Sequence, residues 1–352
     1  MPHSDIHFEQ TATAGLVTLD RPNALNALSM DMVLAFADQL SSWAEDETIT
    51  HVILCSSSPR AFCAGGDIKY ARQLAISDDP AGAEPYFRAE YLGDIALIEF
   101  GKPVIALCDG IVMGGGAGLA QHSQHIVMTE TTRFAMPESA IGLFPDVGAS
   151  LFLGRCPKSV ARLMGMTGHI VGAADCLLLG LATAQVLTGS LADLKEKLLH
   201  DHVDQIDSII SQFQTDAGQS LLASQRQLID HIFADGAVES MRDRAVDLAG
   251  KMPHNKLLNA IVTAFETRCP LSIKLFDRLL AVTDDLTDPV AAIELDFHLA
   301  LRLTKRADFA EGIRAIIIDK DQAPQWTPNP LETVTETMLD AVFDRNGLPS
   351  LR

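Results

Sequence analysis

Two acidic residues stand eight positions apart in a stretch that otherwise holds small, apolar and turn-forming residues. They are Glu138 and Asp146, within the segment from Phe134 to Gly148. A proline precedes each acid and fixes the backbone φ angle at that point. A carboxylate in apolar surroundings tends to have a raised pKa, and two neighbouring carboxylates push their pKa values apart. The stretch therefore predicts acid–base or nucleophilic chemistry. The structural alternative is that the acids are a helix N-terminal residue and a turn or cap residue.

Two glycine clusters could supply the second component of such chemistry. Gly65 and Gly66 end a loop just before Asp67, and a second cluster runs from Gly114 to Gly118 after an apolar segment. Glycine lets backbone N–H groups face a ligand, and a helix N-terminus carries partial positive charge. Two such loops are what an oxyanion hole needs when charge develops on a carbonyl oxygen. Close packing of a helix on a strand is the structural alternative.

Other site chemistries find less support in the sequence. The second glycine cluster is neither a dinucleotide fingerprint nor a P-loop, because Leu119 occupies the third glycine position and no Gly-Lys-Ser/Thr follows. The histidine pairs at 122/125 and 200/202 lack a third ligand and the HExxH pattern. No Gly-x-Ser-x-Gly elbow occurs. Cys63 could be a nucleophile, but without a nearby histidine we interpret it as a small buried residue. What remains is acyl or enolate stabilisation without a metal.

Composition narrows the class of protein. The chain has 352 residues, of which 47% are hydrophobic and 21% charged, and its net charge is −19. Such acidity disfavours general electrostatic binding of nucleic acid or of an anionic membrane. The six cysteines form no CxxC pair, which favours free thiols in a reducing compartment. Met1 to Gln10 shows no secretory or transit signal, and no apolar run reaches ~18 residues. We expect a cytoplasmic enzyme or binding protein.

The pattern of elements predicts an α/β core followed by a helical region. Strands are expected at 14–20, 51–55, 102–109 and 125–128, and Ser29 is the predicted N-cap of an amphipathic helix. Their order favours a parallel sheet with right-handed crossovers, which is a doubly wound pattern. From residue 191 onward helical patterns dominate, at 191–199, 219–233, 238–251, 257–268 and 290–303. We therefore divide the chain into a core at 1–200 and a mainly helical region at 201–352 that completes the candidate site.

Several motifs together resemble the crotonase (enoyl-CoA hydratase/isomerase) superfamily, and most closely its 3-hydroxyisobutyryl-CoA hydrolase branch, which belongs to valine catabolism. The likeness covers about Ala14 to Phe343, and the Pro-Glu…Phe-Pro-Asp pairing is specific to the hydrolase branch. The matching segments are Leu19–Pro22, Asn26–Leu28, Ala61–Ile68, Phe87–Tyr91, Met113–Gly116, Phe134–Gly148 and Asp308–Asp321 with Pro324 and Trp326.

The resemblance implies a fold and a substrate-binding frame. The fold would be the crotonase (ClpP-like) spiral of repeated ββα turns in two stacked sheet layers, and the doubly wound pattern should yield to it. The backbone N–H groups of Gly66 and Gly115 would grip the thioester oxygen. The adenine end of CoA would lie along the loop at Ala61, Cys63 and Ala64, and Lys69 is a candidate for phosphate binding. The basic residues within 302–306 are weaker candidates for binding the CoA phosphates.

The resemblance also implies roles for acidic residues. Glu138 would be the nucleophile, through a mixed anhydride, or the general base for water. Asp146 would orient the substrate hydroxyl or assist proton transfer, and Glu90 would contact the substrate. A hydratase resembling this chain would carry a second catalytic glutamate where Gly118 stands. Thioester hydrolysis is therefore favoured over addition of water to a double bond.

Two rival functions remain, an enoyl-CoA hydratase or isomerase and a non-catalytic structural or assembly relative. The expected binding partner is an acyl-CoA thioester substrate. We expect no binding to nucleic acid or to a membrane. A homo-oligomer is possible, because members of the superfamily often form one. CoA belongs to the substrate, so no separate cofactor and no metal are expected.

Overall fold

A computed structural model of the chain describes residues 5–352. The chain forms two compact units whose segments alternate along the sequence. The first unit comprises Met1–Asp67, Ala89–Phe134 and Ile170–Ala223, and the second comprises Ile68–Arg88, Ala135–His169 and Ser224–Arg352. The sequence analysis instead divided the chain once, near residue 200, and that division stays a prediction. The prediction that Met1 to Gln10 holds no secretory or transit signal falls partly on residues 1–4, which lie outside the described residues.

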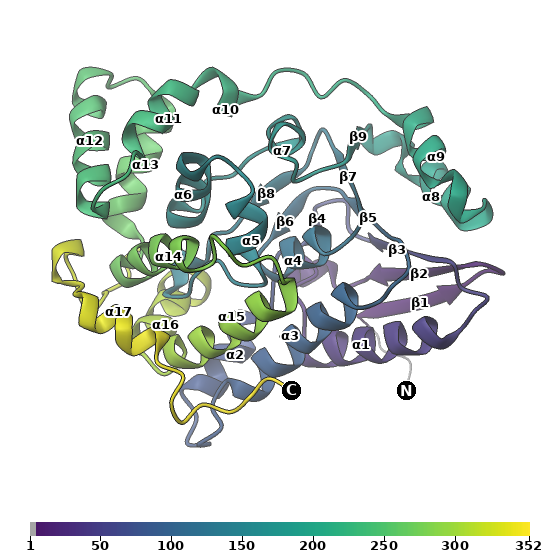
Figure 1. The fold of residues 1–352 in the computed structure, drawn as a ribbon, viewed down its shortest axis with the longest axis horizontal. Coiled ribbons are helices and arrows are strands. Elements are labelled where there is room, and N and C mark those ends of the chain that lie inside the picture. The colour runs from purple at the N-terminus through teal and green to yellow at the C-terminus, as the bar shows by residue number, and fades with distance from the viewer. Residues whose placement is uncertain (1–4) are drawn as a thin grey trace. The chain divides into compact units, whose positions relative to one another are not determined.

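The first unit is built on a six-stranded sheet (Figure 1). Its strand order is β1 (Ile6–Gln10), β2 (Ala14–Leu19), β3 (His51–Ser56), β5 (Val104–Cys108), β7 (His125–Thr129) and β9 (Ala184–Val186). β1 pairs antiparallel with β2, and all other neighbours are parallel. Parallel strands covered on both faces are apolar throughout, which is why the four predicted strands were legible in the sequence. β1 and β9 were not predicted.

Three short strands form a second sheet, and they alternate along the chain with strands of the long sheet. Its order is β4 (Ala61–Cys63), β6 (Ile111–Met113) and β8 (Arg133–Ala135). Each short strand follows a long one and precedes a helix, as in β3–β4–α2 (Ile68–Ala75) and β5–β6–α4 (Gly115–Gln121). The third turn is β7–β8–η2, where η2 is the 3-10 helix Glu138–Ile141. This ββα repeat is the expected crotonase spiral, and it replaces the simple doubly wound reading.

Helices cover the long sheet of the first unit. Ser29 caps α1 (Met30–Glu45), because its hydroxyl accepts a hydrogen bond from the Met32 amide. The further α-helices of this unit are α4, α7 (Ala173–Leu179), α8 (Leu191–His200) and α9 (Ile206–Phe213), with part of α3 (Glu84–Ile98). Apolar residues of α8 and α9 join one buried cluster with alternate residues of the strands, such as Leu16, Ile53 and Ile105.

The second unit is mainly helical, as the pattern after residue 191 predicted. Its helices are α2, the first turn of α3, α5 (Ala149–Gly154), α6 (Lys158–Thr167), α11 (Arg226–Ile232), α12 (Val238–Lys251), α13 (Lys256–Thr267), α14 (Pro270–Val282), α15 (Pro289–Leu303), α16 (Ala307–Ile313) and α17 (Glu336–Phe343). The short helix α10 (Leu221–Ser224) lies at the boundary. The buried Arg162 of α6 donates to Asp277 at 2.8 Å and to Asp235 at 3.0 Å. This charged contact fixes α6 against α14.

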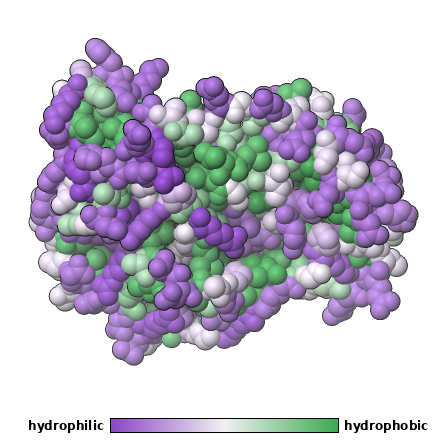
Figure 2. All heavy atoms as spheres, turned by 45° about the horizontal axis from the view of Figure 1, so that its top comes forward, coloured by the Kyte–Doolittle hydropathy of each residue, from purple (hydrophilic) through white to green (hydrophobic). Residues whose placement is uncertain are grey.

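The surface is mixed in polarity. Figure 2 shows one face, on which hydrophilic residues predominate and hydrophobic residues form scattered patches. Of the helices within residues 5–352, none is both long enough and apolar enough to cross a bilayer. All six cysteines are free and buried, as the absence of paired spacing predicted.

Replacing Gly165 by alanine should destabilise the second unit. A Cβ at this position of α6 would lie 2.0 Å from the Phe276 ring of α14. Overpacking a core costs about 1–3 kcal/mol, which exceeds the ~0.5–1 kcal/mol that alanine gains over glycine inside a helix. We expect a lower urea midpoint for Gly165→Ala. Gly250→Ala in α12 is the matched control, because nothing lies within 4 Å of its Cβ and its midpoint should stay or rise. Equal midpoints in the two variants would contradict this packing.

Candidate functional site

Two backbone amides converge in the first unit, at Gly66 and Gly115. Gly115 begins α4, so its N–H has no acceptor within the helix. Gly114 before it has φ 52° and ψ −129°, a conformation that side chains exclude. The residues on either side of Gly66 are bonded to Leu28. The Leu28 amide donates to Gly65 O and the Asp67 amide donates to Leu28 O, each at 2.8 Å, and neither bond uses the Gly66 N–H. A Cβ on Gly115 would lie 3.5 Å from Gly66 N. The two predicted oxyanion donors are therefore neighbours.

The buried side chain of Asn26 holds the loop that carries Gly66. Its Nδ2 donates to Ala61 O at 3.2 Å, to Phe62 O at 2.9 Å and to Ser56 Oγ at 2.6 Å. Its Oδ1 accepts from the Arg21 amide at 2.8 Å. A single amide side chain thus ties three segments together, and it gives a structural reason for the Asn26–Leu28 motif seen in the sequence.

Most of the predicted CoA-binding residues lie on β4, which holds Ala61 and Cys63, or directly after it, at Ala64. Cys63 is fully buried, its thiol donates to Asn26 O at 3.1 Å, and burial raises its pKa to about 12. This thiol is a neutral packing residue, so it could offer CoA only backbone atoms. The Ala61 carbonyl already accepts from Asn26, and the Ala64 amide donates to Leu25 O at 3.0 Å. Lys69 is exposed on α2 of the second unit. The CoA roles of these residues stay predictions.

A buried carboxylate lies against the amide pair. Glu90 of α3 is 6% exposed, and its Oε1 would be 2.5 Å from a Cβ on Gly115. Asp94 follows one turn later on α3 and is 3% exposed. Both line a small apolar cavity of about 10 Å³. The sequence analysis named Glu90 but missed Asp94, although their i, i+4 spacing on a helix was a usable signal.

Glu138 begins η2 in the second unit and is 6% exposed. Its pKa is raised well above the ordinary value, first by burial and then by the negative charge of Asp146. Within residues 5–352 its Oε2 atom has no hydrogen-bond partner. Gly142 closes the η2 turn at φ 71°, and its amide bonds back to Glu138 O. The result is a buried acid, held at the start of a closed turn, with one oxygen that no described residue bonds.

Asp146 lies in the same unit and is 4% exposed. The next residue, Val147, has φ 50°, which is strained for a β-branched side chain. The Gly148 amide donates to Oδ2 of the buried Asp296 at 2.8 Å, and the Ala149 amide donates to Asp146 O at 2.9 Å. These bonds hold the strained turn. The structure therefore brings Glu138 and Asp146 together electrostatically, as the spacing predicted, and adds strain that the sequence did not reveal.

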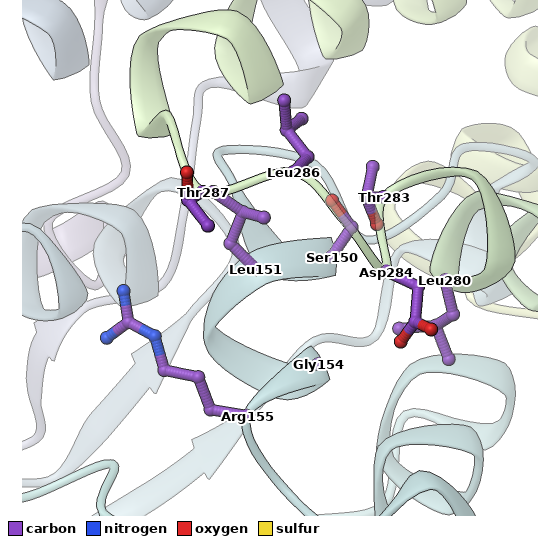
Figure 3. A pocket seen from close by; sticks show the side chains of 9 residues that line it. All are labelled: Ser150, Leu151, Gly154, Arg155, Leu280, Thr283, Asp284, Leu286 and Thr287. Atoms are coloured by element: carbon purple, nitrogen blue, oxygen red, sulfur yellow. The ribbon is translucent and has the colours of Figure 1, made fainter.

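A larger cavity of about 240 Å³ lies elsewhere in the second unit (Figure 3). Its walls come from α5 and the residue after it, from the end of α14 and from the chain between α14 and α15. Its lining residues are Ser150, Leu151, Gly154, Arg155, Leu280, Thr283, Asp284, Leu286 and Thr287. None of the predicted site residues is among them, so this cavity is separate from the chemistry considered above.

Histidine, cysteine, aspartate and glutamate side chains form no metal-holding group of three or more within the described residues. The expectation that no metal or separate cofactor takes part stays a prediction.

Comparison with known proteins places these features in a family. The family profile described as Enoyl-CoA hydratase/isomerase matches residues 14–343. The Gallus gallus protein named 3-hydroxyisobutyryl-CoA hydrolase, mitochondrial, is 34% identical, and the match covers 99% of this chain and 91% of that protein.

Two solved structures have the same fold over nearly the whole chain. A Rhodobacter sphaeroides enoyl-CoA hydratase has a TM-score of 0.90 at 31% identity, covering 99% of this chain and 100% of its own. A Mycobacterium thermoresistibile carnitinyl-CoA dehydratase has a TM-score of 0.90 at 28% identity, covering 99% of each chain. With the family profile spanning both compact units, this chain belongs to the enoyl-CoA hydratase/isomerase family.

Proposed function

We propose that this chain is a CoA thioester hydrolase that cleaves 3-hydroxyisobutyryl-CoA to 3-hydroxyisobutyrate and CoA. The observation that carries the proposal is the buried pair of Glu138 and Asp146, in which the charge of one acid raises the pKa of the other. The support from relatives is the name of the Gallus gallus protein, with which the chain shares 34% identity over 99% of its length.

The proposed reaction starts at the carbonyl group of the thioester. The N–H groups of Gly66 and Gly115 bind the carbonyl oxygen and stabilise the negative charge that develops on it. As a general base, Glu138 takes a proton from water while the oxygen of that water adds to the carbonyl carbon. Collapse of the tetrahedral intermediate breaks the C–S bond, and the CoA thiolate takes up a proton. Asp146 orients the substrate hydroxyl or assists this proton transfer, and Glu90 contacts the substrate.

A nucleophilic route is the alternative for the same residue. A Glu138 oxygen attacks the carbonyl carbon and expels CoA thiolate, which leaves a mixed anhydride that water then hydrolyses. Single turnover in ¹⁸O-labelled water tests the nucleophilic route. Label in the Glu138 carboxyl shows that an anhydride formed, because a general base gains no label, whereas label in the acid product alone fits either route.

An enoyl-CoA hydratase is the second candidate, because two solved structures of high similarity carry hydratase or dehydratase names. A hydratase of this family type would place a second glutamate where this chain has Gly118. A thiol-release assay across short hydroxyacyl-CoA and enoyl-CoA substrates distinguishes the functions, because only hydrolysis frees CoA-SH. A cytoplasmic location and a role in valine catabolism are further parts of the proposal, and 3-hydroxypropionyl-CoA is a second substrate to test.

Removing either acid of the pair should abolish most turnover. We expect Glu138→Gln and Asp146→Asn each to lower kcat for CoA-SH release by at least ~10²-fold, the lower range for acid–base groups. Both substitutions keep side-chain size, so circular dichroism and thermal unfolding should change little. Near-normal kcat in both variants would refute the assignment of these acids.

Filling the oxyanion region should also reduce turnover. A Cβ at Gly115 would lie 2.5 Å from Glu90 Oε1 and close to the Gly66 amide. Loss of one oxyanion donor typically costs ~10²–10³-fold in kcat, so Gly115→Ala should fall in that range. Gly93→Ala is the matched control on α3, since its nearest contact is Val33 O at 3.8 Å and its rate should stay near normal. Equal rates for the two variants would argue against the oxyanion role.

The rate should rise with pH through the raised pKa of Glu138. The carboxylate must be ionised to act as base or nucleophile, and burial and the Asp146 charge both favour its protonated form. Removing that charge in Asp146→Asn should lower the pKa of Glu138. We therefore expect the ascending limb of the residual kcat/KM to move to lower pH than in the wild type. A limb that stays in place or moves to higher pH would contradict the coupling between the two acids.

A further inference from the structure

The motif that begins at Asp308 is part of the family resemblance, but the proposed reaction gives it no role. Its helix α16 lies in the second unit, as does the η2 turn that starts at Glu138. A Cβ on Gly312 of α16 would lie 2.6 Å from the carbonyl carbon of Ile141, the last residue of η2. A Cβ on Gly142, which closes the turn, would lie 2.6 Å from Asp308 O. The helix and the turn therefore meet through their backbones at two points.

Both contact points are connected to Glu138 through the backbone. The carbonyl carbon of Ile141 is covalently joined to the nitrogen of Gly142, and the Gly142 amide donates a hydrogen bond to Glu138 O. The Leu143 amide donates to the same oxygen at 3.2 Å. A displacement of Ile141 is therefore transmitted to Glu138 without passing through a flexible side chain.

Trp326 packs on the same helix from another direction. Its side chain is buried, and its Nε1 donates to Thr267 O at 2.9 Å. The amide of the next residue, Thr327, donates to Oδ1 of the buried Asp308 at 2.7 Å. The Cβ on Gly312 would also lie 2.7 Å from Cη2 of the tryptophan ring. Gly312 is thus enclosed between this ring and the η2 turn.

We propose that Gly312 is a positioning residue, which acts on Glu138 through the backbone of Ile141 and Gly142. A Cβ makes ordinary van der Waals contact from 3.4 Å, so an alanine at position 312 requires a shift of about 0.8 Å, from 2.6 Å to 3.4 Å. The neighbouring atoms are backbone atoms, so the shift displaces the helix or the turn. A misplacement of about 1 Å can cost ~10²-fold in rate. The effect on rate rests on the proposed thioesterase function, but the positioning of the carboxyl group does not.

Gly312→Ala in the full chain tests the proposal by steady-state kinetics. We expect kcat for CoA-SH release to fall about 10–10²-fold with little change in KM, because the reacting carboxyl group is displaced while substrate binding is kept. Gly250→Ala of α12 is the matched control, because nothing lies within 4 Å of its Cβ, and its kcat should equal that of the wild type. Equal kcat values for the two variants would overturn the proposal.

Trp326→Phe separates positioning from stability, because alanine at position 312 also meets the tryptophan ring. This variant loses the hydrogen bond to Thr267 O, so its thermal midpoint should fall while kcat, measured well below that midpoint, stays near normal. The double variant with Gly312→Ala relieves the ring contact alone, so it should keep the rate loss, and it carries the test if Gly312→Ala does not fold. Recovery of kcat in the double variant would show that Gly312 acts on the ring and not on the turn, and would overturn the proposal.

Infrared difference spectroscopy during a pH titration tests the displacement without substrate. The band of Glu138 is the protonated carboxyl band that disappears in Glu138→Gln. Burial is the first cause of the raised pKa of Glu138 and the charge of Asp146 is the second, whereas Asp308 of α16 is ion-paired with Arg306 at 3.4 Å. A displaced turn admits water, so we expect the midpoint of the band in Gly312→Ala to fall by about 0.5 pH units or more.

The infrared midpoint of the Gly250→Ala control should match that of the wild type. An unchanged midpoint in Gly312→Ala would contradict the positioning of the carboxyl group. If the wild type releases no CoA-SH, the proposed function fails, and the infrared midpoints alone decide on Gly312.

Discussion

A helix that begins at a glycine leaves its first amide without an intrahelical acceptor, and much of the first unit serves to keep such an amide accessible. Gly114 can adopt its left-handed conformation only because it lacks a side chain, and this lets α4 start directly after β6. The Asn26 side chain then fixes the loop from β4 so that the Gly66 amide lies near Gly115. Two polar donors are thereby available where most buried amides would be bonded.

The ββα repeat explains why these donors come from different parts of the sequence. Each turn of the spiral contributes one long strand to the six-stranded sheet and one short strand to the three-stranded sheet. Because β4 and β6 are parallel neighbours, the residues that follow them emerge at the same edge. Gly66 and Gly115 follow these two strands, so the topology brings together loops that are about fifty residues apart in the chain.

The buried acidic residues have different surroundings in the two units. In the second unit, burial and the neighbouring Asp146 hold Glu138 toward its protonated form, and a strained turn at Val147 keeps Asp146 in place. In the first unit, Glu90 and Asp94 lie together in an apolar cavity next to the amide pair. An acidic chain of net charge −19 thus holds four of its acids in buried positions, and for Glu138 burial and the charge of Asp146 raise the pKa.

The sequence by itself determined four buried strands and the capped helix after Ser29, and it singled out the residues proposed for the candidate site, because apolar runs, cap residues and glycine clusters are local signals. It did not reveal the three-residue strands β4, β6 and β8, which are too short to show a period. It also could not show that Asp94 joins Glu90, that Val147 is strained, or that Asn26 holds the loop. Those features depend on contacts between distant segments, and only the tertiary structure decides which polar groups are enclosed together and what charge each of them can hold.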